Sequence, residues 1–219
     1  MRRKIKLGMT LILLIGVVVL SRKLSQLVTS ENVKVSGKVI VVDPGHGGTD
    51  PGKVGVNGAL EKDVNLQIAK KLKMKLESSG YKVHMTREDD QITEGKLADM
   101  KRRVTFIEET GADFVVSIHQ NSYTDANVRG AQVFYYSESK QGQELALAVQ
   151  KELSEFDSEY VRNIKGNSDF YLLKKTKVPT IIVECGFLSN PEEAESLILN
   201  EYQEEMAQAI CTAITKWLD

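Results

Sequence analysis

Four consecutive β-branched residues, Val39–Val42, end at Asp43-Pro44, and His46 then stands alone among glycines. β-Branched residues favour buried strands, whereas proline and glycine interrupt regular structure, so this order is typical of a strand that enters a tight loop. The stretch therefore predicts a central strand with an imidazole just beyond its carboxyl end.

Two later apolar runs repeat this order. Residues 114–118 lead directly into His119, and residues 180–183 lead into Glu184. The carboxyl ends of parallel strands meet at one edge of a sheet, where the ligand sites of open α/β folds lie. We therefore expect His46, His119 and Glu184 to share one cleft.

Helical patterns separate these strands. Apolar residues recur every four positions within 61–79, and Gly80 follows as a stop signal. A second apolar stripe lies within 97–107, and residues 81–85 between the two helices are predicted as a strand. Strands and helices that alternate in this way form right-handed crossovers and a parallel sheet. We predict a single three-layer α/β domain over residues 37–219, with a mostly parallel twisted sheet flanked by helices.

The second half follows the same plan less regularly. Apolar spacing predicts a strand at 131–136, a short extended segment at 169–173, and helices at 143–153 and 201–218. Asn190-Pro191 predicts a helix cap with proline in the first turn. The acidic residues within 192–205 are interpreted as a solvated helix face.

The first residues have a separate pattern. Residues 1–6 are rich in lysine and arginine, residues 7–21 carry no charge, and two basic residues follow. This layout is typical of a secretory signal. The uncharged run is shorter than the roughly 20 residues of a full membrane span, and no small-residue cleavage site follows it. We favour a signal anchor over a cleaved signal peptide in residues 1–23, with a linker over 24–36. The domain is then expected outside the cytoplasm, tied to the membrane or secreted.

Charge and cysteine content exclude two classes of protein. The formal net charge of the 219 residues is -1, and no basic run occurs beyond the N-terminal segment, so no surface for nucleic acid is predicted. Cys185 and Cys211 are too few for a disulfide framework. We expect both to be small buried residues without a disulfide bond.

Two histidines at strand ends favour metal chemistry. A catalytic zinc site needs three protein ligands and one open position, and two imidazoles with one carboxylate form an established ligand set. His46 and His119 can supply the imidazoles. We favour Glu61 as the carboxylate, because the loop before it can fold the first turn of its helix over the strand ends. Spacing alone leaves three other acidic residues open: Asp43, Asp50 and Asp63.

Glu184 can act as a base beside such a metal. Zinc lowers the pKa of bound water to about 7, and a carboxylate within hydrogen-bond reach can take the proton and pass it to a leaving amine. The chemistry that needs this combination is hydrolysis of an amide or peptide bond. His84 lies inside a short alternating strand rather than at a strand end, so we interpret it as non-functional.

Four stretches together resemble one enzyme family: Val41–Gly48, Glu61, Ala112–Asn121 and Val183–Asn190. In this order they resemble the zinc-dependent N-acetylmuramoyl-L-alanine amidases of the amidase 3 family, over about residues 38–219. The resemblance implies that His46, Glu61 and His119 bind Zn2+, that Glu184 is the catalytic glutamate, and that the substrate is peptidoglycan. The bond implied is the amide between the lactyl group of N-acetylmuramic acid and L-alanine of the stem peptide.

Within this family the chain looks most like the CwlD-type sporulation amidases, because it is small, has a predicted N-terminal anchor and shows no added wall-binding repeats in its 219 residues. Those enzymes remove peptides so that muramic-δ-lactam can form in spore cortex, which implies a location between the spore membranes. Clostridial members are associated with a lipoprotein, GerS, so a similar activating partner is expected here by analogy.

Two other functions stay open. A zinc peptidase that cuts within the peptide stem would use the same residues. A tethered wall-binding module could keep the pocket with little activity alone. Glu184 argues against the binding module, because binding needs no proton transfer.

Overall fold

The computed structural model describes residues 37–91 and 95–219 of the chain. The predicted signal anchor, 1–23, and the linker, 24–36, lie outside the described residues. Within the described ranges no helix has the length and apolar character that a membrane span needs.

A six-stranded sheet forms the middle layer, with strand order β2-β1-β3-β6-β4-β5. The strands are β1 (Val39–Pro44), β2 (Lys82–Met85), β3 (Phe114–Asn121), β4 (Gln132–Tyr136), β5 (Lys165–Asn167) and β6 (Thr180–Phe187). All neighbouring pairs are parallel except β4 with β6, which is antiparallel. The prediction of a mostly parallel sheet is confirmed, and β1, β3 and β6 lie side by side at its centre.

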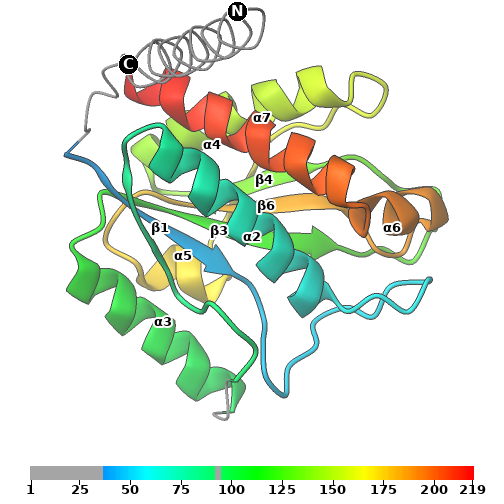
Figure 1. Cartoon of the computed structure of the whole chain (residues 1–219), viewed down its shortest axis with the longest axis horizontal. Helices are drawn as coiled ribbons and strands as arrows, with labels where there is room; N and C mark the ends of the chain where they lie inside the picture. The colour runs from blue at the N-terminus through cyan, green and yellow to red at the C-terminus, as the bar shows by residue number, and fades with distance from the viewer. Residues whose placement is uncertain (1–36, 92–94) are drawn as a thin grey trace, which may run out of the picture. The chain divides into compact units, whose positions relative to one another are not determined.

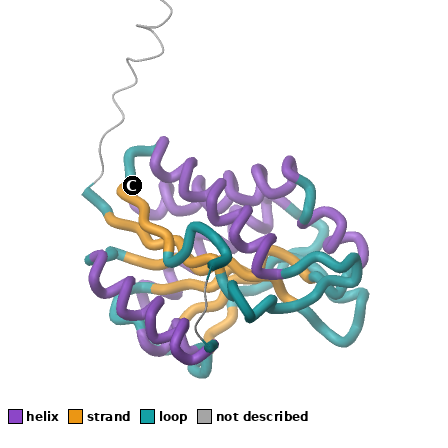
Figure 2. Tube along the Cα trace, turned by 60° about the horizontal axis from the view of Figure 1, so that its bottom comes forward, coloured by secondary structure: helices purple, strands orange, loops and turns teal. Residues whose placement is uncertain are grey.

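Helices cover both faces of this sheet (Figure 1; Figure 2). They are α2 (Glu61–Ser78), α3 (Lys96–Thr110), α4 (Lys140–Phe156), α5 (Tyr171–Lys175), α6 (Pro191–Leu197) and α7 (Asn200–Leu218). α2, α4 and α7 pack together on one face, and α3 and α5 lie on the other. The predicted three-layer α/β arrangement is confirmed.

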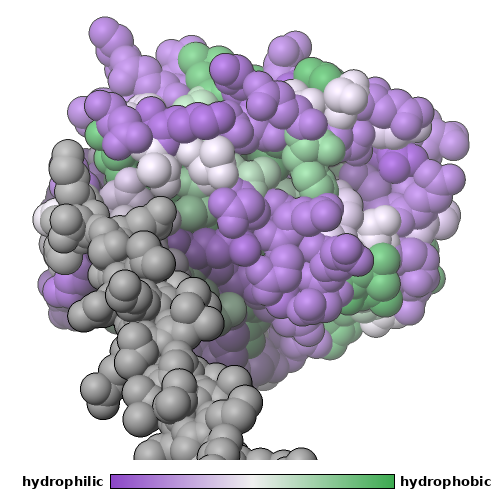
Figure 3. Space-filling model, turned by 45° about the horizontal axis from the view of Figure 1, so that its top comes forward, coloured by the Kyte–Doolittle hydropathy of each residue, from purple (hydrophilic) through white to green (hydrophobic). Residues whose placement is uncertain are grey.

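The larger apolar core lies between the sheet and the layer of α2, α4 and α7. Ile68 and Leu72 of α2, Val116 of β3 and Ile210 of α7 are fully buried there, in agreement with the helical spacing of apolar side chains. A smaller cluster that includes Val41 lies under α3. Burial on both faces explains why the central strands are continuous apolar runs. The face that Figure 3 shows is mostly hydrophilic.

Cys185 on β6 and Cys211 on α7 are both buried and free. The prediction of small buried residues without a disulfide bond is therefore confirmed. Burial raises the pKa of both thiols, so neither is a reactive thiolate at neutral pH.

The extended segment predicted at 169–173 is wrong, because Tyr171–Lys175 forms the short helix α5. The side-chain oxygen of Asn167 accepts hydrogen bonds from the backbone N–H groups of Asp169 and Phe170, which ends β5 in a turn. The two adjacent leucines of α5 are then both buried. A strand would point them to opposite faces.

The acidic residues within 192–205 do not all lie on a solvated face. Glu193 is 3% exposed, and its carboxylate accepts hydrogen bonds from the backbone N–H groups of Gly130 (3.0 Å) and Phe187 (2.8 Å). Asn190 caps α6 as predicted, since its side chain accepts a hydrogen bond from the Glu193 N–H. Glu193 is thus a structural anchor that joins the end of β6 to the loop before β4.

Candidate active site

Three neighbouring strand ends and one helix start converge on a single pocket of about 550 Å³. His46 follows β1, His119 lies near the end of β3, Glu184 lies on β6, and Glu61 is the first residue of α2. His119 stands opposite Glu184 in the parallel register of β3 and β6, so both side chains point to the same face of the sheet. The structure therefore brings together the four residues that the sequence singled out.

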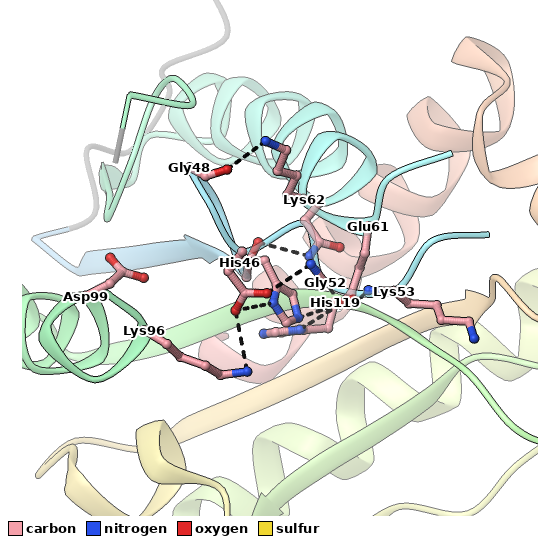
Figure 4. Close-up of polar contacts among 12 residues, drawn as sticks. His46, Gly48, Gly52, Lys53, Glu61, Lys62, Lys96, Asp99 and His119 are labelled. Carbon is pink, nitrogen blue, oxygen red and sulfur yellow. Dashed lines mark hydrogen bonds and ion pairs between the residues drawn. The ribbon is translucent and has the colours of Figure 1, made fainter. Parts of the chain in front are cut away.

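His46, Glu61 and His119 lie close enough to hold one ion. The Oε1 atom of Glu61 is 2.9 Å from Nδ1 of His119 and 3.2 Å from Nε2 of His46. One potential ligand atom from each of the three residues lies within 4.8 Å of the others. Figure 4 shows the three side chains directed at one another from two strand ends and a helix. Two imidazole nitrogens and a carboxylate oxygen form a donor set that zinc accepts, so these residues fit a metal ion.

The loop that carries His46 has an uncommon backbone conformation. His46 has a φ of 60°, in the left-handed region that non-glycine residues rarely adopt. Two buried guanidinium groups hold this loop. Arg87 donates hydrogen bonds to the carbonyl oxygens of Pro44 and Gly45, and Arg103 donates to those of Pro44 and His46. These hydrogen bonds offset the cost of the left-handed conformation and fix the direction of the imidazole.

Gly45 allows the ends of β1 and β3 to approach closely. A Cβ atom at this position would lie 2.1 Å from the Cε1 atom of His119, far inside contact distance. Gly52 has a similar role, because its φ is 67° and a Cβ atom there would lie 2.5 Å from Oε2 of Glu61. The space that His119 and Glu61 occupy therefore requires glycine at both positions.

Backbone groups fix the Glu61 carboxylate. Its Oε2 atom accepts a hydrogen bond from the Lys53 N–H at 2.8 Å, and its Oε1 atom accepts one from the Gln120 N–H at 3.1 Å. Burial acts to raise the pKa of Glu61, but the hydrogen bonds with His119 and His46 outweigh burial and hold this pKa far below its ordinary value. The group is an anion at neutral pH, as a metal ligand must be.

The other three acidic residues that spacing left open have different surroundings. The Oδ2 atom of Asp50 lies 3.0 Å from Nδ1 of His46, so it orients this imidazole from the side opposite to Glu61. Asp43 is buried and ion-paired beneath the loop. Asp63 is exposed on α2. Of the four candidates, Glu61 is the one that reaches both imidazoles.

Glu184 differs from these carboxylates. Burial raises its pKa to about 7, against the opposing effect of His119 and His46. Its Oε2 atom is buried without a hydrogen-bond partner in the described part of the chain. An unpartnered carboxyl oxygen in a pocket is typical of a group that exchanges a proton with a bound molecule.

The residues that support the site were not identified from the sequence. Arg103 forms ion pairs with Asp43 and Asp99. Its position four residues after Asp99 on one helix face is the signal that could have indicated this role. His84, interpreted as non-functional, is not among the residues that line the pocket, and it packs edge-to-face against Phe106.

One edge of the parallel sheet presents two imidazoles, an ionised carboxylate and a buried carboxyl group of raised pKa. This is the arrangement of a metal-dependent hydrolase. Residues 40–216 match the Amidase_3 family, which is described as N-acetylmuramoyl-L-alanine amidase. The chain belongs to this family, which confirms the resemblance and makes the protein a peptidoglycan amidase. Because peptidoglycan lies outside the cytoplasmic membrane, such an enzyme acts in an extracytoplasmic location.

Individual relatives agree with this assignment. The germination-specific N-acetylmuramoyl-L-alanine amidase of Bacillus subtilis is 36% identical over 195 residues, which span 85% of this chain and 82% of that protein. The CwlD amidase of Clostridioides difficile, solved in complex with the GerS lipoprotein, is 38% identical, with a TM-score of 0.80 over 83% of this chain and 98% of that one. The amidase AmiC2 of Nostoc punctiforme is 36% identical, with a TM-score of 0.75 over 83% of this chain and 97% of that one.

Proposed function

We propose that the chain is a zinc-dependent amidase that cleaves the bond between the lactyl group of N-acetylmuramic acid and L-alanine. His46, Glu61 and His119 hold the ion, and Glu184 is the catalytic base. The observation that carries this proposal is that two imidazole nitrogens converge on one Glu61 oxygen in the pocket that Glu184 also lines. When bound there, zinc supplies a Lewis acid for the scissile carbonyl and lowers the pKa of a water molecule.

Glu184 moves the protons in this scheme. Its carboxylate form accepts a proton from the attacking water, and its carboxyl form donates that proton to the departing L-alanine nitrogen. In the metal-free protein burial raises the pKa of Glu184 to about 7, so the carboxyl form that the second transfer needs is accessible near neutral pH. Asp50 and the Lys53 N–H hold His46 and Glu61 in place meanwhile.

The residue roles are tested by comparing zinc content with turnover. Glu184→Ala should bind a wild-type amount of zinc and lose turnover, whereas His46→Ala and His119→Ala should lose zinc. Normal turnover by the Glu184 variant would refute its role as the base. Unchanged zinc content in both histidine variants would refute the ligand assignment.

The biological setting that we propose is the spore cortex. The germination-specific relative supports a role in the spore, and the relative solved with a lipoprotein supports a similar lipoprotein partner. In this proposal the enzyme removes stem peptides before muramic-δ-lactam forms, and the lipoprotein activates it. Residues 1–23 would anchor the catalytic domain, 37–219, through the linker, 24–36, on the outer side of a membrane.

Digestion of spore and vegetative peptidoglycan, with zinc or with a chelator, tests the reaction. Mass spectrometry should find whole stems that begin with L-alanine, released only when zinc is present. Release of stem fragments instead would identify a peptidase, and no release with or without a partner lipoprotein would favour a binding module.

A further inference from the structure

We propose that Lys96 is the specificity-determining residue for the stem peptide: its ammonium group pairs with the free carboxylate of the residue that follows L-alanine. This inference rests on the proposed function, because it needs a peptide whose first amide lies at the metal cluster.

Acidic side chains dominate the charged lining of the pocket. The lining carboxylates are those of Asp43, Asp50, Glu61, Asp99 and Glu184, and the lining cations are Lys53, Lys96 and Arg103. The Arg103 side chain is 2% exposed and is already paired with two of the carboxylates. A carboxylate of a bound peptide needs a cation at the rim that is accessible and is not already paired within the pocket.

Lys96 has the placement that such a contact requires. It is the first residue of α3, its side chain is 73% exposed, and its Nζ atom lies 3.4 Å from Oδ2 of Asp50. Figure 4 shows its amine directed toward the side of His46, whereas the Lys53 side chain extends away from the cluster. Lys96 is therefore the exposed cation that points to the predicted metal site.

The contact between Lys96 and Asp50 leaves capacity for a second anion. The Asp50 carboxylate already accepts a hydrogen bond from the Gly52 N–H at 3.1 Å and contacts Nδ1 of His46 at 3.0 Å. The separation of 3.4 Å from Lys96 exceeds that of a good hydrogen bond. An ammonium group has three donors, so it can keep this ion pair and still bind a carboxylate from the substrate.

Helix stability does not explain a lysine at this position. The first turn of a helix carries partial positive charge, which disfavours cations and favours acidic residues. An exposed ion pair such as Lys96–Asp50 contributes little stability in return. The position of Lys96 therefore needs another reason, and recognition of an acidic substrate supplies one.

The spacing in the substrate fits the site. In peptidoglycan, D-glutamate follows L-alanine and is linked onward through its side-chain carboxyl group, so its α-carboxylate is free unless it has been amidated. That carboxylate lies about two residue lengths, roughly 7 Å, from the scissile nitrogen. Nζ of Lys96 lies 3.4 Å from Oδ2 of Asp50, and this oxygen lies 3.0 Å from Nδ1 of His46. The amine is therefore no more than 6.4 Å from that nitrogen, on the side of the ring away from Glu61.

Two glycan strands test the inference, one with L-alanyl-D-glutamate stems and one with amidated L-alanyl-D-isoglutamine stems. The zinc-loaded wild-type protein should prefer the acidic strand by about tenfold in kcat/KM, the effect of one partly exposed charge-assisted hydrogen bond, and the preference should lie mainly in KM. Lys96→Ala should abolish the preference, and Lys96→Glu should reverse it. The matched control is Lys101→Glu, which makes the same change at an exposed position of α3 outside the pocket lining.

Equal loss of rate on both strands in Lys96→Glu would overturn the inference, because the lysine would then act through Asp50 and His46. A wild-type enzyme that does not discriminate between the strands would also overturn it. Binding of the two strands to the Glu184→Gln protein gives a second measurement. If neither glycan strand is cleaved, the proposed function fails. Tighter binding of the acidic glycan strand that is lost in Lys96→Ala would still support the subsite.

Discussion

Arg103 donates a hydrogen bond of 2.5 Å from its Nη2 atom to the main-chain carbonyl oxygen of His46. The same guanidinium, whose side chain is 2% exposed, pairs with Asp43 at 2.9 Å and with Asp99 at 2.7 Å. One side chain of α3 thus joins the helix to β1 and to the loop in which His46 has a positive φ. The direction of this imidazole depends on α3 as much as on the loop itself.

Removing Arg103 should therefore weaken both the fold and the metal site. Arg103→Met should lower the free energy of unfolding by about 3–5 kcal/mol, because Asp43 is then buried without its counter-charge. Arg103→Lys keeps a charge but not the planar fork, so it should lose less stability yet still bind zinc more weakly. Urea unfolding and competition with a chelator measure the two effects. The control is Arg102→Lys, whose side chain is 33% exposed on the same helix, and equal effects at both positions would contradict the role of Arg103.

The central strands were predictable because helices cover both faces of the sheet. β1, β3 and β6 are therefore continuous apolar runs, a pattern that is typical of strands buried on both faces. The short helix α5 was not predictable from apolar spacing. Its start depends on the side-chain hydrogen bonds of Asn167, and its adjacent leucines are buried by tertiary neighbours that the local sequence does not reveal.

The two imidazoles of the site were predictable because each lies at or just beyond a strand end. Glu61 was favoured as the carboxylate, but spacing alone left Asp50 open, and both residues contact His46. The fold of the loop places Asp50 at Nδ1 and Glu61 at Nε2 of the same ring, and spacing carries no information about that difference. Glu193 was misjudged for a similar reason, because its buried hydrogen-bond donors come from β6 and a distant loop.

Gly45→Ala should prevent metal binding without removing any predicted ligand. The added Cβ atom would lie 2.1 Å from Cε1 of His119, so the imidazole or the loop must move. Zinc content measured by atomic absorption should fall sharply, while circular dichroism shows a retained fold. Gly37→Ala is the matched control, because nothing lies within 4 Å of a Cβ atom there. Wild-type zinc content in the Gly45 variant would contradict the close approach.

Asp43 should stabilise the fold at neutral pH and lose this effect in strong acid. Burial acts to raise its pKa, but Arg103 and hydrogen bonds from Ser117 and Thr86 outweigh burial and lower the pKa from 3.8 to about 2. The resulting stabilisation is complete above pH 3.8, the pKa of Asp43 in the unfolded chain, and it is lost as the pH falls through 2. Asp43→Asn should therefore remove about 2 kcal/mol of acid-dependent stability. Urea midpoints of chelator-treated protein should vary less with pH in this variant, and an unchanged acid dependence would refute the prediction.

Glu184 should reduce the stability of the zinc-free protein at and above neutral pH. Burial raises its pKa from 4.5 to about 7, so the advantage of its neutral form is complete below pH 4.5 and is lost as the pH rises through 7. This shift in pKa corresponds to a loss of about 3 kcal/mol in the free energy of unfolding at about pH 8. Glu184→Gln removes the charge and keeps the shape, so after chelator treatment it should be more stable than wild type at about pH 8 and equal to it at about pH 4. Urea unfolding at both pH values measures this, with the exposed substitution Glu144→Gln as control. Lower stability of Glu184→Gln at the higher pH would mean that the carboxylate supports the fold, whereas higher stability is expected of a side chain retained for catalysis.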